Sequence, residues 1–136
     1  MALKDKDIEI IKEFLMKKIK PFLIYIFGSY AKGTSRSTSD IDIAFLCDEN
    51  FSEYEIFMFA QELASLLNRE IDLVDLKKSS TVFSAQVVGT GTTILCKDET
   101  RRMYFEMRTF KEYALLNEER AVILENIKKR GNVYGE

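Results

Sequence analysis

Residues 22–27 limit the possible folds of this chain more than any other feature. The segment reads Phe-Leu-Ile-Tyr-Ile-Phe and lies between Pro21 and Gly28. A short uncharged run rich in aromatic and β-branched residues is typical of a buried strand. Three further strands are expected at about residues 40–46, 70–76 and 92–96, the last of them at an edge of the sheet.

Helices are expected between and after these strands. Ser52 and Glu55 have the spacing of a capping box and precede a run with one apolar face. Other helices are expected over residues 5–20, from a cap at Ser79 or Ser80 to Gly89, and over residues 99–130 with Asn117 as a candidate break.

The element order predicts an α/β (α+β) fold with a small mixed sheet of three or four strands flanked by helices. We expect a single domain over residues 1–136, with a core at about 22–96 and a helical tail at about 98–130. This tail is longer than such a sheet can cover, so part of it should remain free surface.

The composition excludes several classes of chemistry. The chain has no histidine, which rules out a Ser-His-Asp triad and histidine-ligated zinc. Cys47 and Cys96 are far apart and are expected to be reduced, and no apolar run has the length of a membrane span, so we expect a cytoplasmic protein. Residues 40–75 include ten acidic residues and one basic residue, Arg69, which disfavours direct contact with nucleic acid.

Three aspartates carry the predicted chemistry. Asp40 and Asp42 are two residues apart on an expected strand and so point to the same face, and Asp72 lies in another apolar strand. Carboxylates brought together repel unless a cation neutralises them, and hard oxygen ligands suit Mg²⁺ or Mn²⁺. If the two strands are neighbours, all three can converge on a two-metal site, with Asp40 and Asp42 bridging both ions and Asp72 orienting or deprotonating the nucleophile.

Residues beside this acidic group are suited to phosphate. Gly28 lets the backbone approach a phosphate closely, and Ser29 offers a hydroxyl and an N–H. Lys32 and Arg36 are candidate cations for the outer phosphates, and Ser39 completes the predicted nucleotide-binding set.

Other residues are expected to have structural roles. Asp75 is a rival to Asp72, but alternation places it on the opposite face, near a strand end, where we expect it to be exposed to solvent. Tyr104 and Tyr113 of the long helix are expected to pack or to face a partner.

Taken together, the motifs resemble those of the minimal nucleotidyltransferase (MNT) domain of the superfamily related to DNA polymerase β. The resemblance runs through residues 27–33 (FGSYAKG), 39–43 (SDIDI) and 71–74 (IDLV), and covers residues 22–76 well. Residues 91–95 and 102–106 resemble the antitoxin members of HEPN/MNT toxin-antitoxin pairs. Lys32 stands where many members have arginine. Lysine keeps the positive charge but lacks the bidentate guanidinium of arginine.

The resemblance implies a polymerase beta-like fold, a triphosphate held by Gly28 and Ser29, and metal held by Asp40, Asp42 and Asp72. It further implies an enzyme that transfers AMP from ATP to a tyrosine hydroxyl of a cognate HEPN ribonuclease toxin, which would be bound through the C-terminal helix and the active-site face. HEPN toxins use an arginine-histidine motif. Because this chain has no histidine, we expect that it is not the toxin.

Two alternatives stay open. One is a stoichiometric module that blocks its partner by contact and has a vestigial nucleotide site. The other is a nucleotidyltransferase acting on a small molecule or an RNA end, although such enzymes usually have an additional substrate-binding domain and no basic patch supports RNA.

Overall fold

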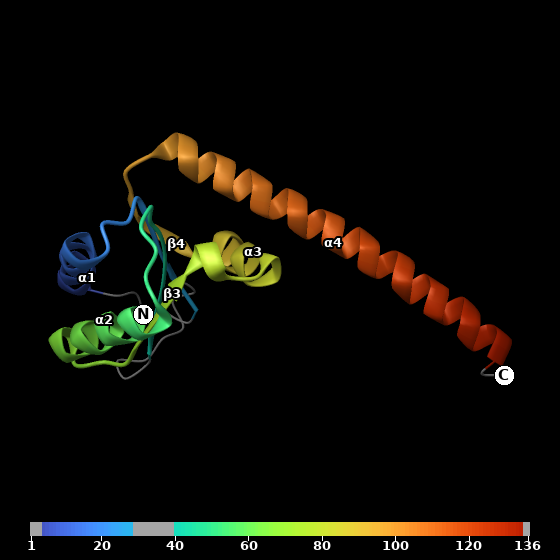
Figure 1. Ribbon diagram of the computed structural model, residues 1–136, viewed down its shortest axis with the longest axis horizontal. Coiled ribbons are helices and arrows are strands. Elements are labelled where there is room, and N and C mark those ends of the chain that lie inside the picture. Colours follow the sequence, from blue (N-terminus) through green and yellow to red (C-terminus); the bar gives the residue numbers. More distant parts are fainter. Residues whose placement is uncertain (1–3, 29–39, 135–136) are drawn as a thin grey trace.

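The computed structural model describes residues 4–28 and 40–134 (Figure 1). The four predicted strands and the four predicted helices are all present. Their order is α1 (Asp5–Lys18), β1 (Leu23–Phe27), β2 (Ile41–Leu46), α2 (Glu53–Leu67), β3 (Ile71–Asp75), the 3-10 turn η1 (Leu76–Lys78), α3 (Thr81–Thr90), β4 (Thr92–Cys96) and α4 (Glu99–Tyr134).

The four strands form one mixed sheet in the order β3-β2-β1-β4. β1 pairs antiparallel with β2 and β4, and β2 pairs parallel with β3. The apolar run of residues 22–27 therefore lies at the interior of the sheet, where buried strands are expected. β4 lies at an edge, which confirms the prediction.

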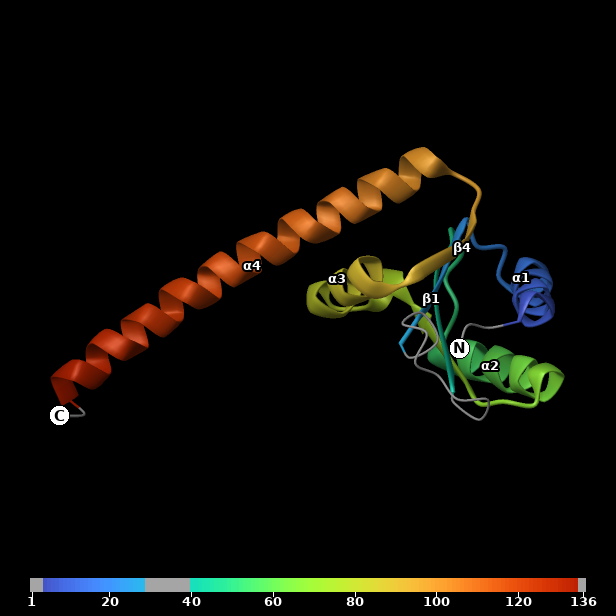
Figure 2. The same ribbon diagram turned by 180° about the vertical axis from the view of Figure 1, so that it is seen from behind.

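Each face of the sheet is covered by its own helices. Ile24, Ile43 and Phe45 share a core with α1 and α2, whereas Tyr25 and Ala44 point to the other face, toward α3 and the beginning of α4. Figures 1 and 2 show α1 and α2 on one side of the sheet and α3 on the other. The two faces follow from the period-2 alternation of strand side chains.

Side-chain caps begin α2 and α3. The Ser52 hydroxyl accepts the N–H of Glu55, whose carboxylate in turn accepts the N–H of Ser52, so the predicted capping box is present. Ser80, one of the two expected candidates, caps α3. α3 continues one residue past Gly89, because the Gly91 N–H still donates to a carbonyl of the helix.

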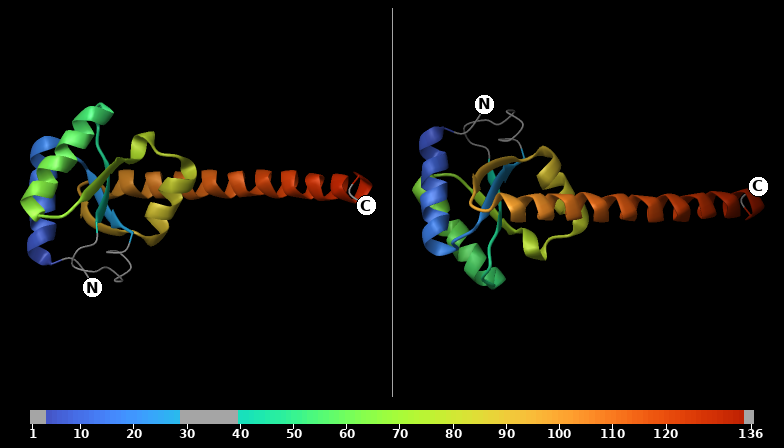
Figure 3. Two further views of the ribbon diagram at one scale, coloured as in Figure 1. Left: turned by 90° about the horizontal axis from the view of Figure 1, so that it is seen from below. Right: turned by 90° about the horizontal axis from the view of Figure 1, so that it is seen from above.

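The last helix differs from expectation in having no break, and it agrees with expectation in leaving free surface. α4 runs unbroken through Asn117 to Tyr134, since asparagine costs a helix interior only a few tenths of a kcal/mol or so. Its apolar stripe of Met103, Met107 and Phe110 is exposed. Figure 3 shows α4 extending far beyond the body of the molecule, so most of its length has nothing to pack against.

The first turns of α4 are attached to the sheet by a polar contact. The hydroxyl of Tyr25, whose side chain is fully buried on β1, donates to Glu106 at 2.5 Å. Arg102 makes ion pairs with Glu106 at 3.2 Å and with Glu99 at 2.7 Å. Burial and the neighbouring Glu106 carboxylate raise the pKa of Tyr25, so its hydroxyl remains a donor at ordinary pH. None of the described helices is long and apolar enough to cross a membrane.

Candidate active site

The two aspartate-bearing strands lie side by side. Asp42 on β2 is in register with Asp72 on β3 and with Phe27 on β1. Paired residues on neighbouring strands point to the same face, with backbones about 4.8 Å apart. The condition set from the sequence, that the strand of Asp72 adjoins that of Asp42, is therefore met.

Asp40 lies just before β2 and is exposed, whereas Asp42 is partly buried. Strand alternation places Asp40 on the same face as Asp42. All three aspartates are thus at the end of the sheet where β2 and β3 begin and β1 ends.

The carboxylates interact electrostatically. Burial raises the pKa of Asp42 to about 6, and the negative charges of Asp72 and Asp40 add to the rise. A carboxyl group that resists ionisation among like charges is a common mark of a functional site. Asp42 is the centre of this group, since both other carboxylates act on it.

Gly28 directly follows β1 and lies beside Asp42. Its φ is +73°, a left-handed conformation that side chains other than glycine rarely adopt. A Cβ at this position would also collide with the Asp42 carboxylate. Both the backbone conformation and the close approach to Asp42 therefore favour glycine, while the predicted approach to a phosphate stays a prediction.

Four candidate nucleotide-binding residues, Ser29, Lys32, Arg36 and Ser39, lie outside the described residues. Their assignment to the triphosphate stays a prediction.

The donor set can be compared with the needs of a divalent ion. Asp42 and Asp72 supply hard carboxylate oxygens of the kind that Mg²⁺ and Mn²⁺ prefer, and the repulsion at Asp42 is what a bound cation would relieve. Within residues 4–28 and 40–134, however, no group of three or more cysteine, aspartate and glutamate side chains is arranged so that it could hold a metal ion. The chemistry of the donors fits, and a shared three-carboxylate site stays a prediction.

The prediction for Asp75 was half right. Asp75 and Asp72 are on opposite faces of β3, but Asp75 is buried, with 8% of its surface exposed. The reason is that β3 turns at once into η1, where one Asp75 oxygen accepts the N–H of Lys77 at 3.0 Å. An aspartate two residues before a turn N–H is a recognisable cap signal in a sequence, and this signal identifies the structural role of Asp75.

The fold and site together define an α/β protein with carboxylates gathered at one end of a mixed sheet, and a protein-family model identifies its class. Residues 9–100 match the family model described as "Polymerase beta, Nucleotidyltransferase". The chain therefore belongs to the polymerase beta nucleotidyltransferase family.

Relatives within this family include protein adenylyltransferases. The chain is 39% identical over 105 residues to protein adenylyltransferase MntA of Shewanella oneidensis, which covers 77% of this chain and 75% of the relative. A putative protein adenylyltransferase of Methanocaldococcus jannaschii is 40% identical over 70 residues, covering 48% of this chain and 68% of the relative.

Solved structures of toxin-antitoxin complexes are also similar to this chain. A toxin-antitoxin complex with the ATP analogue AMP-PNP matches with a TM-score of 0.80 and 37% identity, covering 89% of this chain and 98% of the other. An MNT antitoxin in complex with the tri-AMPylated HEPN toxin of Shewanella oneidensis matches with a TM-score of 0.78 and 33% identity, covering 93% and 99%.

Proposed function

We propose that this chain is a protein adenylyltransferase that transfers AMP from ATP to a tyrosine hydroxyl of a cognate HEPN ribonuclease toxin and so acts as its antitoxin. The observation that carries the proposal is the register of Asp42 with Asp72 beside Gly28, in a chain similar along most of its length to MntA. The relative solved with a tri-AMPylated toxin supplies the substrate class.

The reaction divides among residues of this chain. The tyrosine oxygen bonds to the α-phosphorus of ATP, the bond between that phosphorus and the oxygen bridging to the β-phosphate breaks, and pyrophosphate leaves. Asp72 orients the attacking hydroxyl and takes its proton, while Gly28 lets the backbone approach the triphosphate. Ser29, Lys32, Arg36 and Ser39 are assigned to the triphosphate.

We assign divalent metal, as two Mg²⁺ ions or Mn²⁺, to Asp40 and Asp42 together with Asp72. Bound metal supplies neutralisation of the triphosphate charge and a lowered pKa for the attacking hydroxyl. The three carboxylates would hold the metal, and its charge would relieve the repulsion that Asp72 and Asp40 exert on the partly buried Asp42.

We assign the partner surface to α4 and the active-site face. Exposed apolar side chains continue along α4 well past the part that contacts the body, including Leu115, Val122, Leu124 and Ile127. An exposed apolar surface of this kind, which packs against no other part of the described chain, is typical of a protein–protein interface. We infer a single MNT domain working in the cytoplasm, where Cys47 and Cys96 stay as the free thiols seen here.

The test is to mix the purified chain with the toxin, ATP and Mg²⁺ and to measure the toxin by intact mass spectrometry. We expect a gain of AMP on a tyrosine, lost in Asp42→Asn and Asp72→Asn and kept in Glu13→Gln, a matched charge removal at an exposed residue of α1 outside the assigned partner surface. If both aspartate variants neutralise the toxin as well as the wild type does, the chain is a stoichiometric blocker. AMP on RNA or on a small molecule, with none on the toxin, would identify the other alternative.

A further inference from the structure

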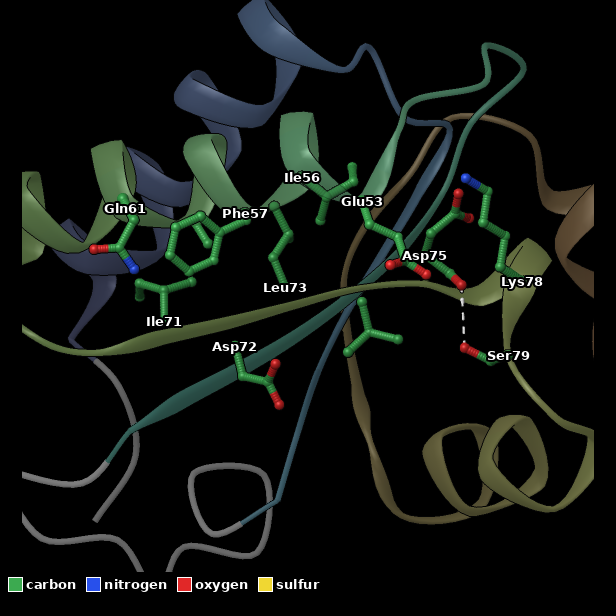
Figure 4. A pocket seen from close by; sticks show the side chains of 12 residues that line it. Glu53, Ile56, Phe57, Gln61, Ile71, Asp72, Leu73, Asp75, Lys78 and Ser79 are labelled. Carbon is green, nitrogen blue, oxygen red and sulfur yellow. Dashed lines mark hydrogen bonds between the residues drawn. The ribbon is translucent and has the colours of Figure 1, made fainter.

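A groove follows the outer edge of β3 and extends away from Asp72 (Figure 4). Its volume is about 470 Å³, and α2 forms the opposite wall. All five residues of β3 line it, with Lys78 and Ser79 at the far end. One hollow therefore reaches both the proposed acceptor position at Asp72 and the end of the strand.

The edge of β3 facing this groove is open. β3 is the terminal strand, and in the described part of the chain it pairs only with β2. The N–H of Ile41 donates to the carbonyl of Glu70. The parallel ladder consequently turns the backbone groups of alternate residues such as Leu73 away from β2. The Ser79 hydroxyl donates to the carbonyl of Asp75 and closes the edge there.

Asp75 brings an unpaired carboxylate oxygen to the groove. Its side chain is 8% exposed, and its Oδ2 has no hydrogen-bond partner. A buried carboxylate oxygen without a hydrogen-bond partner destabilises the folded protein. A donor from outside the chain would satisfy it.

The nearby lysines do not supply this donor. Lys78 Nζ donates to the carbonyl of Phe51 at 2.5 Å, and Lys77 Nζ donates to Glu49 and Asn50. The groove is lined by three carboxylates, Glu53, Asp72 and Asp75, against one lysine, Lys78, so its lining is acidic on balance. The charge favours a basic occupant.

The α2 wall favours an occupant with side chains of its own. Phe57 lines the groove and is 58% exposed, which is unusual for a phenylalanine on a helix that otherwise packs on the sheet. A polypeptide strand provides backbone groups for β3, an apolar contact for Phe57 and a side chain for Asp75. A small cation could pair with Asp75 but would offer nothing to the β3 backbone or to Phe57.

We propose that this groove binds an extended segment of the acceptor protein as an added strand on β3, with a lysine or arginine of that segment on Asp75 and the acceptor tyrosine at Asp72. The inference rests on the proposed adenylyl transfer. Strand addition of this kind draws affinity from backbone hydrogen bonds and specificity from side-chain pockets.

The spacing of the two aspartates defines the segment. Asp72 and Asp75 are three residues apart, about 10 Å along a strand, and point to opposite faces. The basic residue should accordingly lie three positions from the tyrosine, on the other face of the added strand.

Two substitutions test the groove. Phe57→Lys should lower kcat/KM for the toxin about tenfold, through KM, because it removes the apolar contact and repels the basic residue. Affinity for AMP-PNP with Mg²⁺ should be unchanged. Leu66→Lys is the control, since Leu66 is an equally exposed apolar residue of α2 (59%) outside the groove. Asp75→Asn keeps the cap oxygen and replaces the unpaired one by an amide, so kcat/KM should fall without a loss in melting temperature.

A third measurement separates docking from chemistry. Hydrogen exchange at the Leu73 amide should slow when toxin lacking its ribonuclease histidine is bound. If the wild type modifies the toxin but the Phe57 and Leu66 variants behave alike, or if the Leu73 amide stays unprotected, the proposal is overturned. It is also overturned if Phe57→Lys, and not Leu66→Lys, converts a dimer of this chain into monomers. A wild type that modifies no toxin refutes the proposed function instead, and the Leu73 measurement still decides the groove.

Discussion

Replacing Asp42 by asparagine should make the protein more stable at alkaline pH while it destroys the active site. Burial, Asp72 and Asp40 raise the pKa of Asp42 to about 6 from an ordinary 3.8. The folded state therefore binds the proton more tightly than the unfolded state does. The stabilisation from this proton is complete below pH 3.8 and is lost as the pH rises through about 6.

The size of the effect follows from the shift. The difference between a pKa of 3.8 and one of about 6, at about 1.36 kcal/mol for each pKa unit, gives about 3 kcal/mol as an upper bound on the stability gained by the variant. Asp42 is partly exposed, and screening by water reduces this to roughly 1–2 kcal/mol. For a chain of this length, that corresponds to a rise in melting temperature of roughly 3–8 °C.

The assay is thermal unfolding followed by circular dichroism in EDTA at pH 8 and at pH 4. Asp42→Asn should melt above the wild type at pH 8, and the two should converge at pH 4. Mg²⁺ should raise the melting temperature of the wild type more than that of the variant. Glu125→Gln controls for the loss of one exposed negative charge. An Asp42→Asn protein that melts at or below the wild-type temperature at pH 8 would refute the electrostatic argument.

Three further changes have defined outcomes. Gly28→Ala should abolish AMP transfer, because its Cβ meets the Asp42 carboxylate and its φ is +73°; full activity in the mass assay would contradict this contact. Tyr25→Phe removes the 2.5 Å hydrogen bond to Glu106 and should cost about 1–2 kcal/mol in urea unfolding, whereas Tyr104→Phe, at an exposed residue, should cost nothing measurable. Ser52→Ala removes the capping box and should cost about 1 kcal/mol, with Ser65→Ala on the same helix as its control; equal effects would exclude the cap as the cause.

The strands and caps were predictable because their signals are local. The alternation around Asp42, the apolar run ending at Gly28 and the spacing of Ser52 with Glu55 each depend on residues a few positions apart. Their positions in the structure follow these patterns closely.

Features that depend on tertiary contacts were not predictable. The stripe of Met103 and Met107 has helical spacing, but periodicity does not say which face of a helix finds a partner, and here Phe105 and the bond from Tyr25 to Glu106 attach the opposite side. The burial of Asp75 likewise depends on a turn that folds back over the strand end. The groove beside it depends on the distance between α2 and β3, which no local pattern encodes.

The unbroken α4 also fixes a distance and an angle. At about 1.5 Å per residue, its 36 residues span about 54 Å. A partner bound to its outer half is therefore held at a fixed distance from the aspartates. The number of residues in α4 also sets the direction in which its outer surface faces, because each residue turns the helix by about 100°. Removing seven residues from its outer half would shorten the reach by about 10 Å with only about 20° of rotation. Removing two would turn the outer surface by about 200° and point it away from the original partner.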